Sequence, residues 1–141
     1  MKVGFSILEI VLVTSLLAVL AVFTVPVGIR FYQTSVLGDV AETAITLLRR
    51  AQRQAIAEKN NSAFGVQFFA GNMVLFQGTT YATRVVGQDE VFNFSNTVSV
   101  SGLSEVDFAA IVGTTANIGS VIFSSGGQSK TITVNGKGLS Y

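Results

Sequence analysis

The stretch GFSILEIVLVTSLLAVLAVF, residues 4–23, joins a long apolar run to one acidic side chain near its start. Residues 10–29 form twenty positions without a charge, bounded by Glu9 and Arg30. A helix of that length covers roughly 30 Å, about the hydrocarbon thickness of a bilayer. The run therefore predicts a membrane-spanning helix, and Glu9 is the residue that such a helix does not explain.

The composition of the whole chain excludes several kinds of function. The 141 residues are 49% hydrophobic and 12% charged, with a net charge of +1, and they include neither cysteine nor histidine. The chain therefore has no disulfide framework, no thiol nucleophile and no zinc–thiolate site, and it lacks the commonest general base. We expect a protein that is not an enzyme and that has no cofactor and no metal.

A carboxylate such as Glu9 in a membrane helix needs a positively charged partner. An ionised carboxylate costs about 2.5–3.5 kcal/mol at the centre of a membrane helix, and less near an end. If the chain were cut after Gly4, the new amino group at Phe5 would lie one helical turn before Glu9. Within one helix that amine points along the axis, whereas a neighbouring helix shifted by about a turn presents its amine well. We interpret Glu9 as a docking group for another copy of the chain.

Two simpler interpretations of the same segment remain open. A plain single-span anchor accounts for every residue except Glu9. A cleaved secretory signal requires a basic head and small residues before the cut. AVLA at 18–21 can supply the small residues, but the head is only MKVG and Glu9 interrupts the apolar part.

The sequence MKVG followed by FSILEIVLVTSLLAVLAVF resembles the class III signal of type IV prepilins and type II secretion pseudopilins. The resemblance implies that a prepilin peptidase cuts between Gly4 and Phe5 and methylates the amino group of Phe5. It also implies that Glu9 sets the register of assembly. Pro26 stands where many helices of the family bend or unwind. The departures are a leader of four residues with one basic residue, Lys2, and SIL in place of the commoner threonine–leucine–isoleucine.

A second helical pattern occupies residues 36–59, after a helix break, either a kink or a local melt, that we expect at Pro26 and Gly28. Asn60 and Asn61 are expected to end it, because asparagine tolerates the left-handed conformation of a helix cap. At 100° per residue the apolar and the charged positions fall on opposite sides of this helix. The apolar positions are Val36, Val40, Ala44, Leu47, Leu48, Ala51 and Ala55, and the charged ones are Asp39, Glu42, Arg49, Arg50 and Arg53.

After residue 60 the periodicity becomes that of β-strands. Phe64, Val66 and Phe68 alternate with other residues, AGNM at 70–73 is a turn candidate, and MVLF at 73–76 is the return strand of a hairpin. Asn135 and Gly136 form a turn into a final strand. Further strands are predicted at 90–94, 97–101, 119–124 and 129–134. An antiparallel sheet of this kind buries one face against the apolar arc of the helix.

This layout is α+β, and it is the pilin fold that the resemblance implies. LLRRAQRQAIAEKNN, FGVQFF and the ending ITVNGKGLSY are similar to the H-type minor pseudopilin and T-type fimbrial group. We expect four parts along the chain. They are a leader at 1–4, a transmembrane or filament-core half of the helix at 5–29, an amphipathic half at 30–59 and a β-rich domain at 60–141.

Other groups of residues are weaker candidates for sites. Arg49, Arg50 and Arg53 form a basic cluster, which we interpret as a solvated face or subunit contact, because no aromatic residue interleaves with it for binding nucleic acid. The acids Asp89, Glu90, Glu105 and Asp107 raise the question of calcium, but the loops at 124–138 hold no acid to complete a site. The five phenylalanines assigned to core packing are Phe64, Phe68, Phe92, Phe94 and Phe123.

We therefore expect a structural subunit of a type IV pilus or of a type II secretion pseudopilus. The implied partners are a prepilin peptidase, other pilin or pseudopilin subunits, an inner-membrane assembly platform and, before assembly, membrane lipid. The chain would first span the inner membrane once, with its carboxy-terminal domain outside the cytoplasm, and would then join a periplasmic or surface filament. Two alternatives remain open: a membrane-tethered binding module and a DNA-binding competence pilin.

Overall fold

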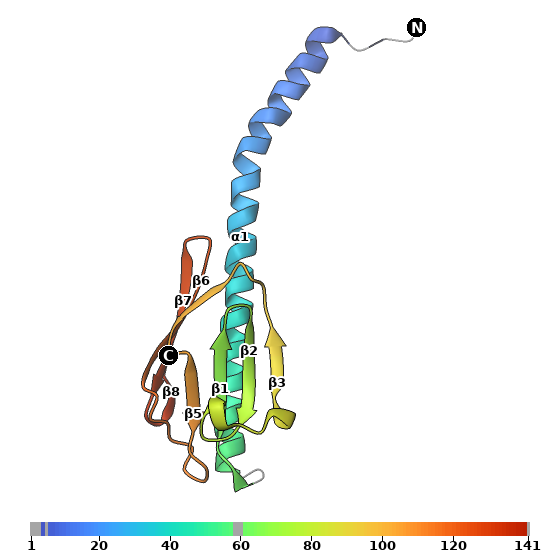
Figure 1. Cartoon of the computed structure of the whole chain (residues 1–141). Helices are drawn as coiled ribbons and strands as arrows, with labels where there is room; N and C mark the ends of the chain where they lie inside the picture. Colours follow the sequence, from blue (N-terminus) through green and yellow to red (C-terminus); the bar gives the residue numbers. More distant parts are fainter. Residues whose placement is uncertain (1–3, 5, 58–60, 141) are drawn as a thin grey trace.

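One long helix, residues 7–56, runs the length of the molecule. Two small antiparallel sheets pack around its lower half, residues 33–56, and its upper half, residues 7–32, projects beyond them (Figure 1). The computed structural model describes residues 4, 6–57 and 61–140, with the backbone alone at 25, 26, 139 and 140. The predicted α+β arrangement of an amino-terminal helix followed by antiparallel β-structure is confirmed.

The helix α1 runs from Ile7 to Ile56, 50 residues in all. It begins after Ser6, whose extended backbone and side-chain oxygen cap it by accepting a bond from the Leu8 amide at 3.3 Å. The helix ends earlier than expected, and residues 58–60 lie outside the described part of the chain. Asn61 has a φ of 52°, so it adopts the left-handed conformation expected of an asparagine at this position.

No local melt interrupts the helix at Pro26 and Gly28, because α1 continues through both residues. Figure 1 shows that the upper half leans away from the axis of the lower half. A proline removes one backbone donor and crowds the preceding turn, but the hydrogen bonds on either side can hold the helix together. Of the two expected outcomes, a kink or a local melt, the continuous helix excludes the melt, and the lean of the upper half is in the direction of the kink.

The strands form two four-stranded sheets, where the sequence had suggested a single sheet. The first sheet has the order β3-β2-β1-β5 and the second has the order β4-β6-β7-β8, and all neighbouring strands are antiparallel. The strands of the first sheet are β1 (Phe64–Phe69), β2 (Asn72–Gln77), β3 (Glu90–Asn93) and β5 (Glu105–Phe108). Those of the second are β4 (Ser99–Gly102), β6 (Gly119–Ser125), β7 (Gln128–Asn135) and β8 (Gly138–Ser140).

The predicted hairpins are confirmed, and each has a two-residue turn. In β1–β2 the pair Phe69 and Asn72 flanks the turn, and in β7–β8 the pair Asn135 and Gly138 does so. A third hairpin, β6–β7, turns through Gly126 and Gly127, whose φ angles of 56° and 80° suit the twist of the flanking strands. The strand β5 was not predicted.

The core lies between the lower half of α1 and both sheets. The apolar arc of the helix is buried as predicted, with Val36 only partly buried at its upper end. Phe68 from the first sheet and Phe123 from the second meet edge to face, with their ring centroids 6.0 Å apart. Phe64 is also buried, and Phe92 and Phe94 pack against the core while partly exposed, which agrees with the predicted use of these rings. The two sheets and the helix therefore share one core.

Candidate functional site

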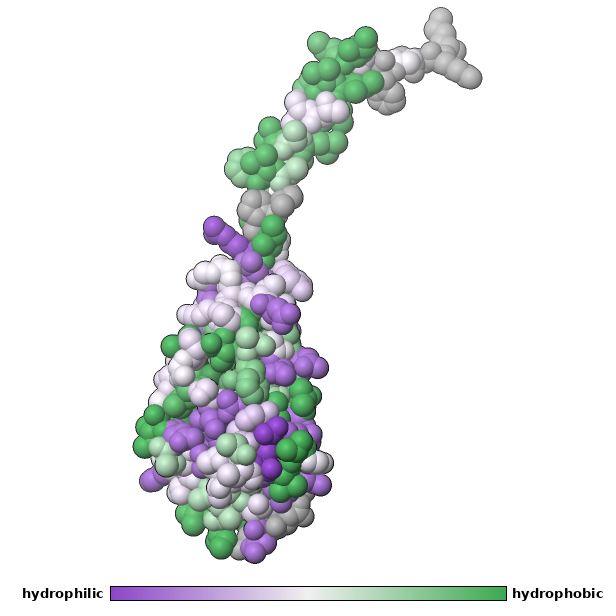
Figure 2. All heavy atoms as spheres, viewed as in Figure 1, coloured by the Kyte–Doolittle hydropathy of each residue, from purple (hydrophilic) through white to green (hydrophobic). Residues whose placement is uncertain are grey.

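The most unusual surface of the molecule is the upper half of α1. Every side chain described between positions 7 and 32 is exposed, and Leu8 and Phe23 are 73% and 71% exposed. Figure 2 shows this half as a largely apolar rod that projects from a more polar domain. Among the described residues, α1 is the one helix long and apolar enough to cross a membrane. A surface this large and apolar requires lipid or protein around it.

The hydroxyl groups of this half satisfy their own hydrogen-bonding capacity. Each of three hydroxyls donates to a backbone carbonyl one turn earlier in α1. The bonds join Thr14 to Ile10 (2.9 Å), Ser15 to Leu12 (2.8 Å) and Thr24 to Leu20 (2.9 Å). Because these donors are already paired, they do not oppose transfer of the helix into an apolar environment.

Glu9 lies in the first turn of α1, three residues after the cap Ser6. The spacing Ser-x-x-Glu is that of a capping box, and a carboxylate near the start of a helix is stabilised by about 0.3–1 kcal/mol through the helix dipole. The Glu9 carboxylate is exposed and makes no hydrogen bond or ion pair with any described residue. Beside it a shallow hollow is lined by Ile10, Val13 and Thr14. The acid therefore has local support in the helix but no ionic partner among the described residues.

Of the two residues that flank the expected cut, the structure describes Gly4 but not Phe5. Gly4 is exposed, and a Cβ atom placed on it would have no heavy atom within 4 Å. Phe5, the residue expected to carry the methyl group, lies outside the described residues. The described helix begins just after this pair, at Ile7.

The structure does not bring the three arginines of the basic cluster together as one free patch. Arg50 forms an ion pair with Glu90 on β3, with 2.7 Å between Nη2 and Oε1. Arg49 and Arg53 are exposed on the outer side of the helix. The pairing of Arg50 therefore ties the helix to the first sheet and removes one cation from any surface that would attract an anion.

The four acids that raised the question of calcium lie in separate contacts. Among the described residues there is no group of three or more acidic side chains placed to hold a metal. Each acid instead accepts a hydrogen bond or forms an ion pair within the chain. The pairs are Asp89 with Arg84, Glu90 with Arg50, Glu105 with the Tyr81 amide, and Asp107 with Asn117.

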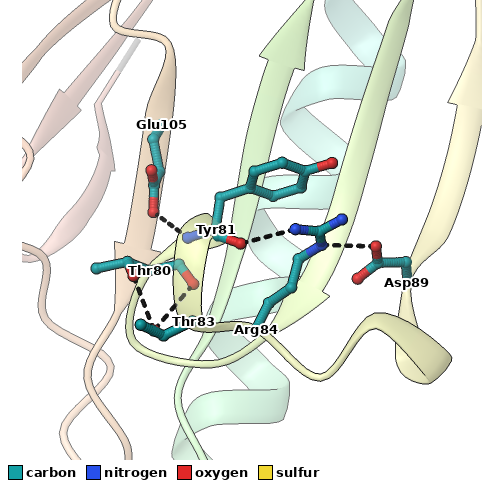
Figure 3. Close-up of polar contacts among 6 residues, drawn as sticks. All are labelled: Thr80, Tyr81, Thr83, Arg84, Asp89 and Glu105. Carbon is teal, nitrogen blue, oxygen red and sulfur yellow. Dashed lines mark hydrogen bonds and ion pairs between the residues drawn. The ribbon is translucent and has the colours of Figure 1, made fainter.

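The loop between β2 and β3 forms a polar cluster that the sequence did not indicate (Figure 3). Arg84 donates from Nε to Asp89 at 2.7 Å and from Nη1 to the Tyr81 carbonyl at 2.9 Å, and its guanidinium lies 3.7 Å from the centre of the Tyr81 ring. The hydrogen bond with Asp89 raises the pKa of Arg84 above its ordinary value. Tyr81 also packs edge to face against Phe69 and Phe76. The cluster holds the loop against the outer side of the first sheet, and we assign it a structural role.

No family model, no curated protein and no solved structure matches this chain.

Proposed function

We propose that this chain is a structural subunit of a type IV pilus or of a type II secretion pseudopilus. The observation that carries the proposal is the upper half of α1, which is apolar on all sides and has an acid without an ionic partner among the described residues at its head. That half is continuous with a half that is built into the core of the domain. The resemblance of residues 1–23 to a class III signal adds the expected cut after Gly4 and methylation of Phe5.

In this proposal the subunit first spans the membrane through α1, with its domain outside the cytoplasm. It then leaves the lipid and packs its upper half against those of other subunits. Moving an apolar helix from lipid to protein gains little hydrophobic energy, so packing and paired polar groups must provide selectivity. Glu9 is such a group, because a neighbour's amino group at Phe5 would neutralise it. A subunit inserted one turn out of register would leave a buried charge unpaired, at a cost of several kcal/mol.

The first test is the intact mass of the protein recovered from material sheared off the cell surface. We expect the mass of residues 5–141 plus one methyl group. A full-length mass found only in the membrane fraction would contradict the proposal and favour a membrane-tethered binding module. Filaments with the expected mass but with salt-sensitive affinity for DNA would favour the competence pilin.

The second test separates the two roles of Glu9. We expect Glu9→Ala to insert into the membrane normally but to be depleted at least about tenfold in filaments, which corresponds to about 1.4 kcal/mol. Glu9→Gln keeps the shape of the side chain and its capacity to cap the helix, but it lacks the charge. If pairing with an amine is what matters, Gln will be as defective as Ala. Normal incorporation of Gln would show that assembly does not need the charge of Glu9.

A further inference from the structure

The lower end of the domain presents exposed apolar side chains. They are Ile56 at the end of α1, and Ile111 and Val112 in the loop between β5 and β6. Figure 1 shows this loop, in orange, beside the lower end of the helix, at the opposite end of the molecule from the exposed upper half. We call these three residues the apolar tip.

Backbone hydrogen bonds hold the loop of the apolar tip against the end of the helix. The Ile111 amide donates to the Ala55 carbonyl at 2.9 Å, and the Gly113 amide donates to the Ala109 carbonyl at 2.9 Å. The Gln52 side chain donates to the Gly113 carbonyl at 2.9 Å. The Ala55 carbonyl is among the last four of α1, which lack the usual helical partner, so the loop caps the helix. The loop contributes only backbone groups to this cap, which therefore does not explain its apolar side chains.

Ile111 has a backbone conformation that does not suit its side chain. Its φ is 72°, in the left-handed region, where a β-branched residue is an outlier and where glycine or asparagine is preferred. Glycine or asparagine would form the same backbone cap at a lower conformational cost. An exposed isoleucine at this position therefore indicates that the side chain itself has a role.

The uncovered side of the lower half of α1 differs from the apolar tip, because it is charged. Two grooves flank it, one of about 440 Å³ beside Phe92 of β3 and one of about 560 Å³ beside β7. Asp39 and Glu42 line both grooves. Arg50 lines the first groove and Lys130 lines the second. An apolar partner laid along this side would remove these charges from water at a cost, so such a partner is expected at the tip instead.

The upper half of α1 in a second copy has the chemistry to cover the tip. Residues 10–20 of that half carry no charge, and all their side chains are exposed. The exposed charges that flank the tip are cations: Arg53, one turn before Ile56, and Lys137, whose carbonyl accepts a bond from Gln52 at 2.8 Å. Residues 10–20 bring no like charge to these cations, and Glu9, which precedes them, has the opposite sign.

The dimensions of the chain allow this contact without overlap between domains. Residues 10–20 lie 36–46 positions before Ile56, so a parallel copy displaced by about 54–69 Å along the helix axis brings them level with the tip. The lower half, residues 33–56, is only about 36 Å long, so the two domains clear each other. Two such steps displace a third copy by more than about 100 Å, which exceeds the length of about 75 Å for the 50-residue helix.

Two other occupants of the tip fit less well. Tip-to-tip pairing of two copies would point their upper halves in opposite directions, so both copies could not be anchored in one membrane. Lipid is also out of reach, because a membrane spanned by the upper half would end about 36 Å along α1 from Ile56. The upper half of another copy is therefore the occupant that the arrangement favours.

We propose that the apolar tip of one copy binds residues 10–20 of α1 in another copy, once the upper half of that second copy has left the lipid. The contact joins unlike surfaces, so each copy keeps its own residues 10–20 available for a further tip, and the contact repeats in an open series. The inference rests on the proposed function, to which it adds a surface of the domain that covers the exposed helix of another subunit.

Photo-cross-linking tests which surface the tip contacts. The chain has no cysteine, so Val112→Cys can carry a single benzophenone maleimide. In sheared filaments we expect adducts between position 112 and residues 10–20, located by mass spectrometry of the linked peptides. Within one copy these residues lie about 54 Å or more from the end of the helix, so such an adduct must join two copies.

Val86→Cys is the matched control for the cross-linking. Val86 is 67% exposed, against 65% for Val112, and it lies between β2 and β3, on the other side of α1 in Figure 1. We expect no adduct to residues 10–20 from this position. The proposal would be overturned if Val112→Cys gave no such adduct, linked only to residues 33–140 or to phospholipid, or gave the same products as the control.

The strained isoleucine provides a second test, which separates the contact from the fold. We expect Ile111→Asn to leave the urea midpoint of the domain unchanged or higher, since asparagine tolerates the left-handed conformation. The same variant should lower filament yield about tenfold or more, because it places a polar amide in an apolar contact. Val86→Asn should change neither quantity. A normal yield from Ile111→Asn, or a yield that falls together with the midpoint, would count against the contact.

The experiments separate this inference from the proposed function. If the unsubstituted chain is found only as the full-length form in the membrane, the proposed function fails and the tip contact fails with it. If filaments with the expected mass form while Val112→Cys gives no adduct to residues 10–20 and Ile111→Asn assembles normally, the tip contact is wrong and the proposed function stands.

Discussion

The upper and lower halves of α1 have the same secondary structure and opposite surroundings. The lower half buries Ala44, Ala51 and Ala55 completely, and these small side chains let the strands approach the helix closely. The upper half exposes bulky residues such as Leu8 and Phe23. A small buried side chain is matched to neighbours within the same chain, whereas a bulky exposed one needs neighbours from outside it. The comparison indicates that a single copy completes only half of the packing of its own helix.

The largest effect that we expect is on processing at the head of the upper half. Gly4→Leu should leave the full-length precursor in the membrane, because a bulky side chain would obstruct the peptidase. It should not change the stability of the domain, since Gly4 has no neighbour to disturb. Gly28→Ala is the control, at another glycine with open space around it, and should be cut normally. Intact mass measures both, and a normally cut Gly4→Leu chain would remove the basis for the class III signal.

An alanine-to-aspartate substitution should affect the stability of the domain when it is placed in the lower half, and membrane insertion when it is placed in the upper half. Ala51→Asp would bury a charge without a partner in the core, and we expect it to lower the free energy of unfolding by more than about 4–5 kcal/mol. Ala21→Asp should leave that free energy unchanged but add about 2.5–3.5 kcal/mol to membrane insertion. Urea unfolding in detergent, followed by near-ultraviolet circular dichroism, measures the first effect, and membrane fractionation measures the second. If Ala21→Asp lowered the free energy of unfolding as much as Ala51→Asp, the upper half would contribute to the stability of the domain, which contradicts the comparison.

A matched pair of phenylalanines sharpens the comparison at the level of packing. Phe123→Ala should lower the free energy of unfolding by about 3–5 kcal/mol, because the ring is fully buried and packs edge to face against Phe68 and Phe94. Phe23→Ala should change it by less than about 0.5 kcal/mol, since that ring is exposed. The same urea titration is used for both chains. An equal effect at the two positions would show that the upper half packs onto the domain.

The smallest effect that we expect concerns the ion pair between Arg50 and Glu90. Both side chains are about 40% exposed, at 41% and 39%, so solvent screens the pair. Arg50→Ala should lower the free energy of unfolding by about 0.2–1 kcal/mol, and the difference should shrink in high salt. Arg30→Ala, in the exposed half, should have no measurable effect. A loss from Arg50→Ala that persists in high salt would indicate that packing of the arginine stem is the main contribution.

The helix and its two faces could be read from the sequence because their periodicity is local. The apolar arc from Val40 to Ala55 repeats at helical spacing, and every member of that arc is buried. The hairpins were equally accessible, because alternation around Phe64–Phe69 and the glycine turns each involve only a few neighbouring residues.

The division into two sheets could not be read in the same way, because it depends on distant pairs. The strand β5 pairs with β1, about forty residues earlier in the chain, and its four residues include Glu105 and Asp107. By their chemistry these acids are candidate metal ligands, whereas in the fold they lie on the partly buried outer side of the strand, opposite Val106 and Phe108. The need for glycine at position 65 could not be predicted from the sequence either. Only the fold shows that a Cβ atom there would lie 2.5 Å from the Phe76 ring.

Only part of the candidate site was accessible from the sequence. The positions of Gly4, Glu9 and the apolar run follow from their order in the chain. That the charged face of residues 35–53 is uncovered and flanked by two grooves follows from the placement of β3 and β7, which no local pattern determines.

The continuity of α1 also has a mechanical meaning. Tension applied to the upper half passes into the lower half along one backbone, without a linker to absorb it. The load then reaches the buried face of the helix, where it is distributed as shear over contacts with both sheets. A chain with one continuous helix resists extension at the junction between the two halves. Under sufficient tension, the contacts between the helix and the two sheets would break before the helix separated at that junction.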